Sequence, residues 1–443
     1  MRAYARNERP REALDCFSHM QIHGIKADPH TWELPSLGAL GEGQQIHAAI
    51  VDSGCEGEVI VATALVNMYG KCRGVQHVRR VFSQMPERNV VTWNAMISAF
   101  SHNGYAQEAF DLFHQMQYNG FTPDHITVIC IVDACGDFAA LDKGQQIHAT
   151  IIERGYEGHL VVGNALVNMY GKCQSLHDAH GVFRRMQKHN VVSWNTMISA
   201  CAQNGHRIEA LETFHNMDSD GIRPNEVTFL CALDACAGMA NLHEEQKIHA
   251  GIVKSKYEGQ LAVGNALINM YGKCNSLQNA LNVFNQMPQR NVISWTTIIS
   301  ACTQNGCCKE ALDYYDQMQK TSLKPNRITF LGALDACTKL AALEKGQEIH
   351  GTIIDGGYEG LTMVGNALIT MYGQCRALQD AKSVFGRTCH RDVISWNSMI
   401  AACTWNGRGK EALDYFDEMQ RYASWFPRGG SNLGPKKRCS VMM

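Results

Sequence analysis

The feature that most constrains this chain is an internal repeat with a period of 101 residues. Two series of aromatic residues keep this interval along the sequence: Trp93, Trp194, Trp295 and Trp396, and Tyr69, Tyr170, Tyr271 and Tyr372. Separate globular domains rarely keep such a register. A long period kept without insertions is typical of an array in which each unit buries its apolar surface against the next one.

Each repeat divides into shorter units that have the pattern of helical hairpins. Segments 90–124, 125–159 and 160–190 contain 35, 35 and 31 residues. Both expected helices of the first segment carry apolar residues at i, i+3, i+4 and i+7: Trp93, Met96, Ile97 and Phe100, then Ala109, Leu112, Phe113 and Met116. Gly104 separates the two helices, and Gly120 with Pro123 ends the hairpin. We therefore expect an all-α solenoid of stacked hairpins with a concave face.

The composition excludes several classes of protein. The formal charge of -2 and the isoelectric point near 6.8 give no overall basic signal, so contact with a polyanion would depend on local arrangement. The chain has no run of 18 apolar residues, and its opening MRAYARNERPREAL lacks the apolar core of a secretory signal. We expect a soluble chain that makes no membrane contact. Most of the 18 cysteines lie in apolar helical patterns, so we interpret them as reduced core residues.

The two ends of the chain depart from the repeat. Residues 1–28 match a hairpin without its first seven residues, so we expect the native chain to begin earlier. Segment 29–58 is short, and Pro35 predicts a shortened or kinked first helix there. From residue 421 the sequence becomes turn-rich and then basic, which predicts a disordered tail over 421–443.

The segments NVVTWNAMISAFSHNGYAQEAF and VVGNALVNMYGKC, with the 35, 35, 31 rhythm, resemble the pentatricopeptide repeat family, and specifically its plant-type subclass of alternating P, L and S motifs. A tetratricopeptide array is the nearest rival, but its uniform 34-residue period is absent. The resemblance implies a right-handed superhelical array over residues 1–420. Its segments are P at 1–28 (partial), 90–124, 191–225, 292–326 and 393–420 (partial); L at 29–58 (short), 125–159, 226–260 and 327–361; and S at 59–89, 160–190, 261–291 and 362–392.

The resemblance implies that each hairpin addresses one nucleotide of single-stranded RNA. In the family, the fifth and the last residue of a P or S motif contact the base edge. The P segments place there Asn94 with Asp124, Asn195 with Asn225, Thr296 with Asn326, and Asn397 in the final partial segment. The S segments place there Thr63 with Asn89, Asn164 with Asn190, Asn265 with Asn291, and Asn366 with Asp392. Amides, hydroxyls and carboxylates offer different sets of donors and acceptors, so their combinations can match different bases. Helix capping is the alternative role of these side chains, and the two roles can coexist.

Two further residue series follow from the same resemblance. The second residue of a motif is expected to press on a base face: Val91, Val192, Ile293 and Ile394 in P segments, and Ile60, Val161, Ala262 and Met363 in S segments. Lys71, Lys172 and Lys273 match a lysine that the family places near the RNA backbone, whereas Gln374 breaks that series. The L segments depart from the reading pattern, because their fifth and last residues are Ile129 with His159, Leu230 with Gln260, and Leu331 with Leu361. We assign them roles in spacing and packing.

No residue pattern predicts catalysis, a metal or a cofactor. The repeated histidines His47, His148, His249 and His350 lie in successive repeats, too far apart to share an ion. His243 and Glu245 match H-x-E of the zinc deaminases, but the C-x-x-C that completes that signature is absent.

We therefore expect a sequence-selective binder of single-stranded RNA that acts in organellar RNA processing, editing guidance or stabilisation. By resemblance it acts in a mitochondrion or chloroplast, as a monomer, with any RNA-processing or editing enzyme supplied in trans. Two alternatives stay open: a helical scaffold that binds proteins, and a truncated editing factor that lacks its deaminase domain.

Overall fold

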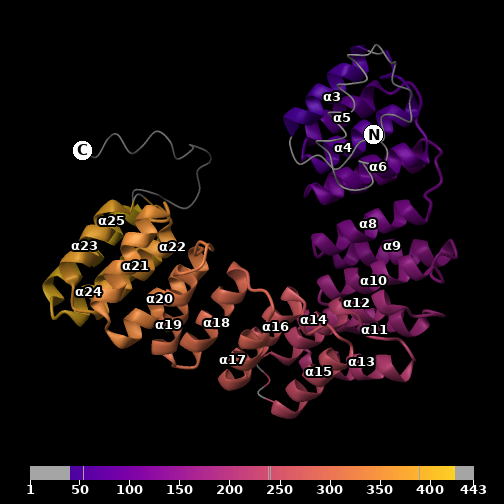
Figure 1. The fold of residues 1–443 in the computed structure, drawn as a ribbon. Coiled ribbons are helices and arrows are strands. Elements are labelled where there is room, and N and C mark those ends of the chain that lie inside the picture. Colours follow the sequence, from indigo (N-terminus) through magenta and orange to yellow (C-terminus); the bar gives the residue numbers. More distant parts are fainter. Residues whose placement is uncertain (1–39, 53, 238, 240, 389, 425–443) are drawn as a thin grey trace, which may run out of the picture. The chain divides into compact units, whose positions relative to one another are not determined.

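A computed structural model describes residues 40–424, apart from residues 53, 238, 240 and 389, and all regular structure in this described part is helical (Figure 1). The helices are α3 (Leu40–Asp52), α4 (Val59–Lys71), α5 (Val75–Gln84), α6 (Val90–His102), α7 (Ala106–Tyr118), α8 (His125–Asp137), α9 (Leu141–Glu153), α10 (Leu160–Lys172), α11 (Leu176–Arg185), α12 (Val191–Gln203), α13 (Arg207–Ser219) and α14 (Glu226–Cys236). They continue as α15 (Leu242–Lys254), α16 (Leu261–Lys273), α17 (Leu277–Gln286), α18 (Val292–Gln304), α19 (Cys308–Gln319), α20 (Arg327–Leu340), α21 (Leu343–Asp355), α22 (Thr362–Gln374), α23 (Leu378–Arg387), α24 (Val393–Trp405) and α25 (Gly409–Ser424). None of these helices is both long and apolar enough to cross a membrane.

The predicted hairpins are confirmed, since each segment from 59 to 392 forms two helices. The first helix begins at the first residue of its segment, as α6 does at Val90 and α10 at Leu160. Gly104 and Gly120 adopt the left-handed backbone that was expected after each helix, with φ of 88° and 82°. The last helix, α25, continues to Ser424 and so passes the predicted end of the array at residue 420. The hairpin predicted over 1–28, the effect of Pro35 and a tail over 425–443 lie outside the described residues.

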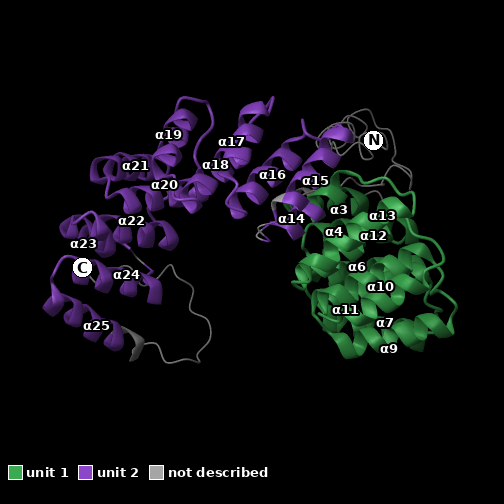
Figure 2. Cartoon of the chain, turned by 90° about the horizontal axis from the view of Figure 1, so that it is seen from below, with its two compact units in different colours: residues 1–231 green, residues 232–443 purple. Residues whose placement is uncertain are grey.

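The chain forms two compact units, residues 1–231 and 232–443 (Figure 2). In the first unit, the first helices of successive segments pack in the order α4, α6, α8, α10, α12. In the second unit the same arrangement runs through α16, α18, α20, α22, α24. In the hairpins from α4 to α13 and from α16 to α25, the second helix packs on its own first helix. The core of each unit therefore lies between hairpins that follow one another in the sequence.

The repeated tryptophans belong to this core, as the helical spacing predicted. Trp93 and Trp194 are buried, and each lies edge-on to a phenylalanine from the preceding S segment, Phe82 and Phe183, with ring centroids 4.9 and 5.1 Å apart. Trp295 and Trp396 repeat the contact in the second unit. The repeated histidines also pack locally, because His148 Nδ1 lies 2.8 Å from the hydroxyl of Tyr170, and the other three repeats keep this bond.

The junction between an S segment and the following P segment (the S-to-P junction) is fastened at the ends of its first helices. A Cβ atom added to Gly171 of α10 would lie 2.7 Å from the Cβ atom of Ala200 of α12, so only glycine permits this approach. Asn204, which ends α12, donates from Nδ2 to the carbonyl oxygens of Gly171 and Ala200, both at 2.8 Å. The three other described S-to-P junctions keep the glycine, the alanine and the asparagine.

Candidate nucleic-acid interface

The fifth and last residues of a P segment come together because the last residue caps the helix that follows. Asp124 is the N-cap of α8, where its Oδ1 accepts a hydrogen bond from the backbone nitrogen of Thr127 at 2.8 Å. The same oxygen accepts from Nδ2 of Asn94, in the second turn of α6, at 3.0 Å. The helix cap therefore holds one half of the predicted pair against the other half.

A threonine completes this arrangement at the junction between a P segment and the following L segment (the P-to-L junction). Thr127, third in α8, donates from its hydroxyl to Oδ1 of Asn94 at 2.5 Å. In the next repeat, Thr228 donates to Oδ1 of Asn195 at 2.6 Å, and Nδ2 of Asn195 donates to Asn225 at 3.1 Å. The amide oxygen and one amide hydrogen are thus occupied, which leaves one N–H of each asparagine for a ligand.

The third described P-to-L junction carries the smaller pair Thr296 and Asn326. The hydroxyl of Thr296 lies 2.7 Å from the carbonyl oxygen of Val292 and 2.7 Å from the hydroxyl of Thr329. Asn326 caps α20 as Asp124 caps α8. Thr296 therefore contacts the threonine at the third position of the next helix, as the asparagines do. Its other hydrogen bond goes to its own helix, whereas Asn94 and Asn195 donate to the cap residue.

The predicted pairs of the S segments are held less completely. Asn366 donates to Asp392 at 3.2 Å, and these two residues are 26 positions apart in the sequence, whereas the residues of a P pair are 30 positions apart. Within the described chain, no hydrogen bond joins Asn164 to Asn190 or Asn265 to Asn291, and Oδ1 of Asn164, Asn265 and Asn366 is buried without a partner. At these junctions the third residue of the next helix is a serine whose hydroxyl bonds to the cap, as Ser193 does to Asn190 at 3.1 Å. A buried acceptor without a partner costs about 1–3 kcal/mol, which a ligand donor or a water molecule relieves.

The two remaining predicted base-reading sites lie nearest the ends of the described chain. The hydroxyl of Thr63 donates to the carbonyl oxygen of Val59 at 2.6 Å, and Asn89 caps α6. Asn397 is exposed on α24, and the residue that would pair with it falls outside the described residues. The alternative role in capping is confirmed, because side chains at the segment ends accept hydrogen bonds from the backbone of the next helix: Asn89, Asp124, Asn190, Asn225, Asn291, Asn326 and Asp392. Base reading stays a prediction.

Two of the caps are carboxylates, and their surroundings favour the charged form. Burial on its own would raise the pKa of Asp124, but hydrogen bonds from the Thr127 backbone, the Asn94 amide and the Thr127 hydroxyl lower that pKa overall. Burial on its own would also raise the pKa of Asp392, but hydrogen bonds from Ser395 and Asn366 lower that pKa overall. Both caps therefore carry a negative charge at the positive end of a helix.

The fifth residues lie mostly inside the protein, whereas the second residues lie on its surface. Asn94, Asn195 and Thr296 expose only 6–8% of their surface, so each offers a small polar edge. By contrast, the large apolar second residues of the P and S segments are 51–62% exposed: Ile60, Val91, Val161, Val192, Ile293, Met363 and Ile394. Ala262 is exposed as well. We call this series the apolar ladder.

The sequence analysis did not predict that the second residues of the L segments extend the apolar ladder. Ile126, Val227 and Ile328 are their second residues, and they are 48–51% exposed, slightly less than most of their P and S counterparts. An apolar residue in the first turn of every segment was the signal available in the sequence. The last residues of the L segments, His159, Gln260 and Leu361, start the next helix without a side-chain cap, in contrast to the P and S pairs.

The predicted phosphate-binding lysines end the first helices of the S segments. Lys71, Lys172 and Lys273 are exposed and are the last residues of α4, α10 and α16, where a cation also complements the helix dipole. They lie roughly 12 Å along the helix axis from the fifth residues, at 1.5 Å per residue. Lys172 is engaged, because its Nζ lies 2.6 Å from Oδ1 of Asp137. A phosphate group would compete with that exposed pair.

Comparisons with known proteins agree on one family. Models of the PPR repeat family and the PPR repeat match residues 88–137, 189–238 and 290–339, and residues 1–25, 60–90, 164–191, 265–292 and 394–422. A pentatricopeptide repeat-containing protein of Arabidopsis thaliana is 35% identical over 95% of this chain and 62% of its own length. A second, named as chloroplastic, is 36% identical over 91% of this chain and 47% of its own. A third, named as mitochondrial, is 31% identical over 97% of this chain and 42% of its own length. The chain thus spans about half the length of these relatives.

Solved structures show the same fold. The crystal structure of the pentatricopeptide repeat protein PPR10 from maize matches with a TM-score of 0.58 and 20% identity, over 98% of this chain and 63% of that one. PPR10 in complex with an 18-nt psaJ RNA element matches with a TM-score of 0.55 and 20% identity, over 95% and 63%. The solenoid of stacked hairpins predicted from the sequence is therefore confirmed as a fold class.

Proposed function

This chain belongs to the pentatricopeptide repeat family, and from that premise we propose that it binds single-stranded RNA sequence-selectively, without catalysing a reaction itself. One observation carries the proposal: hydrogen-bonded polar pairs recur near the starts of first helices in different repeats, beside the exposed apolar ladder. Unpaired bases offer a flat face for the apolar residues and an edge for the polar ones. The complex of PPR10 with RNA supports this assignment by likeness of fold.

The pairs at the P-to-L junctions differ in the groups that they offer to a base. Asn94 with Asp124 joins a free amide hydrogen to a carboxylate, whereas Thr296 with Asn326 joins a hydroxyl to an amide. The family resemblance associates asparagine and aspartate with uracil, threonine and asparagine with adenine, and two asparagines with pyrimidines. The implied target is 5′-A-U-x-Y-Y-x-Y-A-x-U-3′, where x stands opposite an L segment.

The biological setting belongs to the same proposal. The rhythm of 35, 35 and 31 residues supports the subclass of alternating P, L and S motifs, and relatives named as chloroplastic or mitochondrial support action in one of these organelles. We propose that the chain works as a monomer in RNA processing, editing guidance or stabilisation. An RNA-processing or editing enzyme, supplied in trans or by a part of a longer chain, would perform the chemistry.

The decisive experiment transplants one pair onto another. Thr296→Asn with Asn326→Asp installs the Asn94 and Asp124 pair at a junction that already has the matching Thr329. The double variant keeps the helix cap, since Asp124 caps α8. We expect preference at that nucleotide to change from adenine to uracil by about 1–3 kcal/mol, with other positions unchanged. Competition binding with RNAs that differ at this nucleotide measures the change.

Three outcomes would reject the proposal. Equal weakening for all RNAs would mean that these side chains are caps only. Selection from a random RNA pool that returns no motif, or equal affinity for a duplex and for its single strand, would favour a scaffold for protein partners instead.

A further inference from the structure

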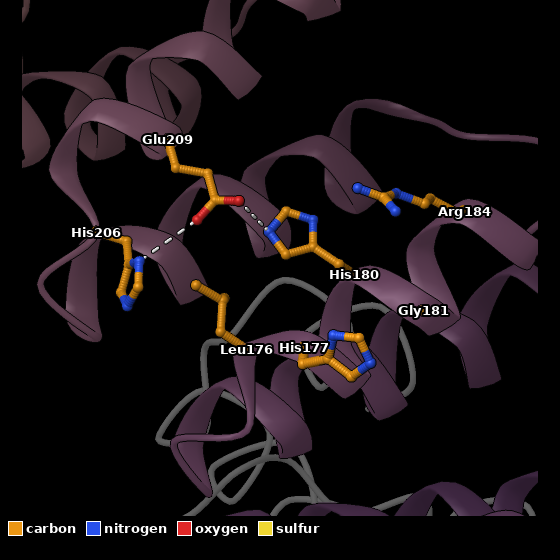
Figure 3. Close-up of a pocket in the computed structure, with 7 residues that line it drawn as sticks. All are labelled: Leu176, His177, His180, Gly181, Arg184, His206 and Glu209. Atoms are coloured by element: carbon orange, nitrogen blue, oxygen red, sulfur yellow. Dashed lines mark ion pairs between the residues drawn. The ribbon is translucent and has the colours of Figure 1, made fainter.

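Four side chains of the kinds that bind metal ions meet where the second helices α11 and α13 pack near the end of α12, away from the starts of the first helices. His180 lies on α11, Cys201 near the end of α12, His206 directly before α13 and Glu209 in the first turn of α13. His180, His206 and Glu209 line an open hollow of about 320 Å³ (Figure 3). Three helices, from one S segment and the following P segment, thus contribute to one cluster.

The distances bring the donor atoms close together. Nε2 of His180 lies 2.8 Å from Oε1 of Glu209 and 3.9 Å from Sγ of Cys201. Nδ1 of His206 lies 3.5 Å from the other oxygen of Glu209. Figure 3 shows the carboxylate between the two imidazole rings, with Arg184 on the far side of His180.

The other repeats show what this position does elsewhere. The counterparts of His180 and Glu209 are Arg79 with Glu108 in one repeat and Lys382 with Glu411 in another, and both are ion pairs. The counterparts of His206 are Tyr105, Cys307 and Arg408, and the repeat with Cys307 has Leu281 and Glu310 at the positions of His180 and Glu209. Only here, among the junctions of this kind in the described chain, do two imidazoles face the glutamate where a permanent cation would balance its charge. The ring nitrogens have lone pairs to offer, which the guanidinium and ammonium groups lack.

We propose that His180, Cys201 and Glu209 bind one divalent transition-metal ion of the zinc class, and that His206, which lies 3.5 Å from the other oxygen of Glu209, turns toward the ion as a fourth ligand. Zinc takes imidazole nitrogen, thiolate sulfur and carboxylate oxygen at about 2.0–2.3 Å, which places neighbouring tetrahedral ligands roughly 3.3–3.8 Å apart. The separations of 3.9 and 3.5 Å are already near this value, and the bond of 2.8 Å between His180 and Glu209 has only to open slightly. The ligand atoms of His180, Cys201 and Glu209 all lie within 4.8 Å of one another.

Cys201 is the ligand that binding must change most. Its side chain is fully buried, and a thiol ligand gives up its proton when a metal ion binds. Coordination then forms the metal–sulfur bond and releases that proton to solvent. The imidazoles and the carboxylate, which line the hollow, therefore receive the ion first, and Cys201 completes the site from the buried side. The bound ion would fasten α11 to α13 across an S-to-P junction.

The test compares the full chain with a variant that imitates another repeat. His180→Lys recreates the Lys382 and Glu411 pair, so it removes a ligand while restoring an ion pair that the fold already uses. Cobalt(II) is titrated as the probe. We expect the wild-type chain to take up one more equivalent than His180→Lys, with a thiolate-to-cobalt charge-transfer band that Cys201→Ala abolishes.

Affinity and stability supply the second readout. We expect His180→Lys to weaken zinc binding at this site by more than the roughly 10–100-fold caused by loss of an outer hydrogen-bond partner. Zinc should raise the Tm of the wild-type chain and not that of His180→Lys. Because the chain has 18 cysteines that could bind metal elsewhere, the measured quantity is the difference in uptake between the wild-type chain and His180→Lys, not the total uptake. Equal stoichiometry and equal affinity in the two chains would overturn the proposal.

Discussion

The P-to-L and S-to-P junctions join similar first helices in two different ways. At a P-to-L junction, the threonine, the fifth residue and the cap form one hydrogen-bonded group at the helix starts, as in Thr127, Asn94 and Asp124. At an S-to-P junction, the fastening lies at the helix ends, where Gly171 meets Ala200 and Asn204. The proposed recognition of RNA and the packing of the helices therefore depend on the same side chains at a P-to-L junction, and on different side chains at an S-to-P junction. Substitutions should affect the two properties together in the first case and singly in the second.

The largest effect is expected where the S-to-P junction is tightest. Gly171→Ala places a Cβ atom 2.7 Å from Ala200 and 3.3 Å from its backbone, so we expect a loss of about 1–3 kcal/mol in the free energy of unfolding. The matched control is Gly351→Ala, on an exposed helical surface with nothing within 4 Å of the added atom. That control should gain roughly 0.5–1 kcal/mol from helix propensity. Urea unfolding measures both, and a stabilised Gly171→Ala would disprove the tight contact.

Removing the asparagine should weaken the same junction by less. Asn204→Ala loses hydrogen bonds to Gly171 and to Ala200, at about 0.5–1.5 kcal/mol each. Asn119→Ala is the control, because Asn119 ends α7 with the same bond to its own helix and none across a junction. The difference in unfolding free energy between the variants isolates the bond to Gly171. Equal losses would show that this bond contributes nothing.

At the P-to-L junction, the expected change appears in recognition. Thr228→Val removes the hydroxyl that holds Oδ1 of Asn195, so we expect base discrimination at that nucleotide to fall by roughly three- to tenfold, the equivalent of one hydrogen bond. Ser193→Ala removes a cap contact at an S-to-P junction, where the serine does not reach Asn164. It should leave discrimination unchanged. Competition binding with matched RNAs separates the two, and equal discrimination in both variants would contradict the coupling.

The smallest effect concerns acid. The pKa of Asp124 lies below its ordinary value of 3.8 in the folded chain, so its contribution to stability is complete above that value and is lost as pH falls through the lower, folded pKa. We expect exchange protection of the Thr127 amide to weaken between about pH 5 and pH 2, after correction for intrinsic rates. The Thr228 amide is the internal control, since its cap, Asn225, does not titrate. Asp124→Asn should abolish the difference, whereas equal acid sensitivity at both amides would refute the assignment.

The sequence was sufficient for the hairpins, because apolar spacing and the Gly104 type of turn act within a single segment. It also predicted the burial of Trp93, which depends on the same spacing. What it lacked was contact across segments. That Thr127 holds Asn94, and that Asn164 lacks such a partner, depends on how two helices meet 33 residues apart. The cluster around Glu209 escaped notice for the same reason, since its four residues follow no ligand spacing and converge only when α11 and α13 pack.

The apolar ladder has a consequence for the thermodynamics of ligand binding. Val91, Ile126 and Val161 stay half-exposed in the free chain, and a base stacked on each would remove that surface from water. Such burial has a large negative heat-capacity change, whereas contacts to phosphate are marked by dependence on salt. The net charge is only -2, and few lysines lie along the apolar ladder. RNA binding should therefore depend only weakly on salt, and its enthalpy should become steeply more favourable on warming. Each added segment, L segments included, should deepen that heat-capacity change by a similar step.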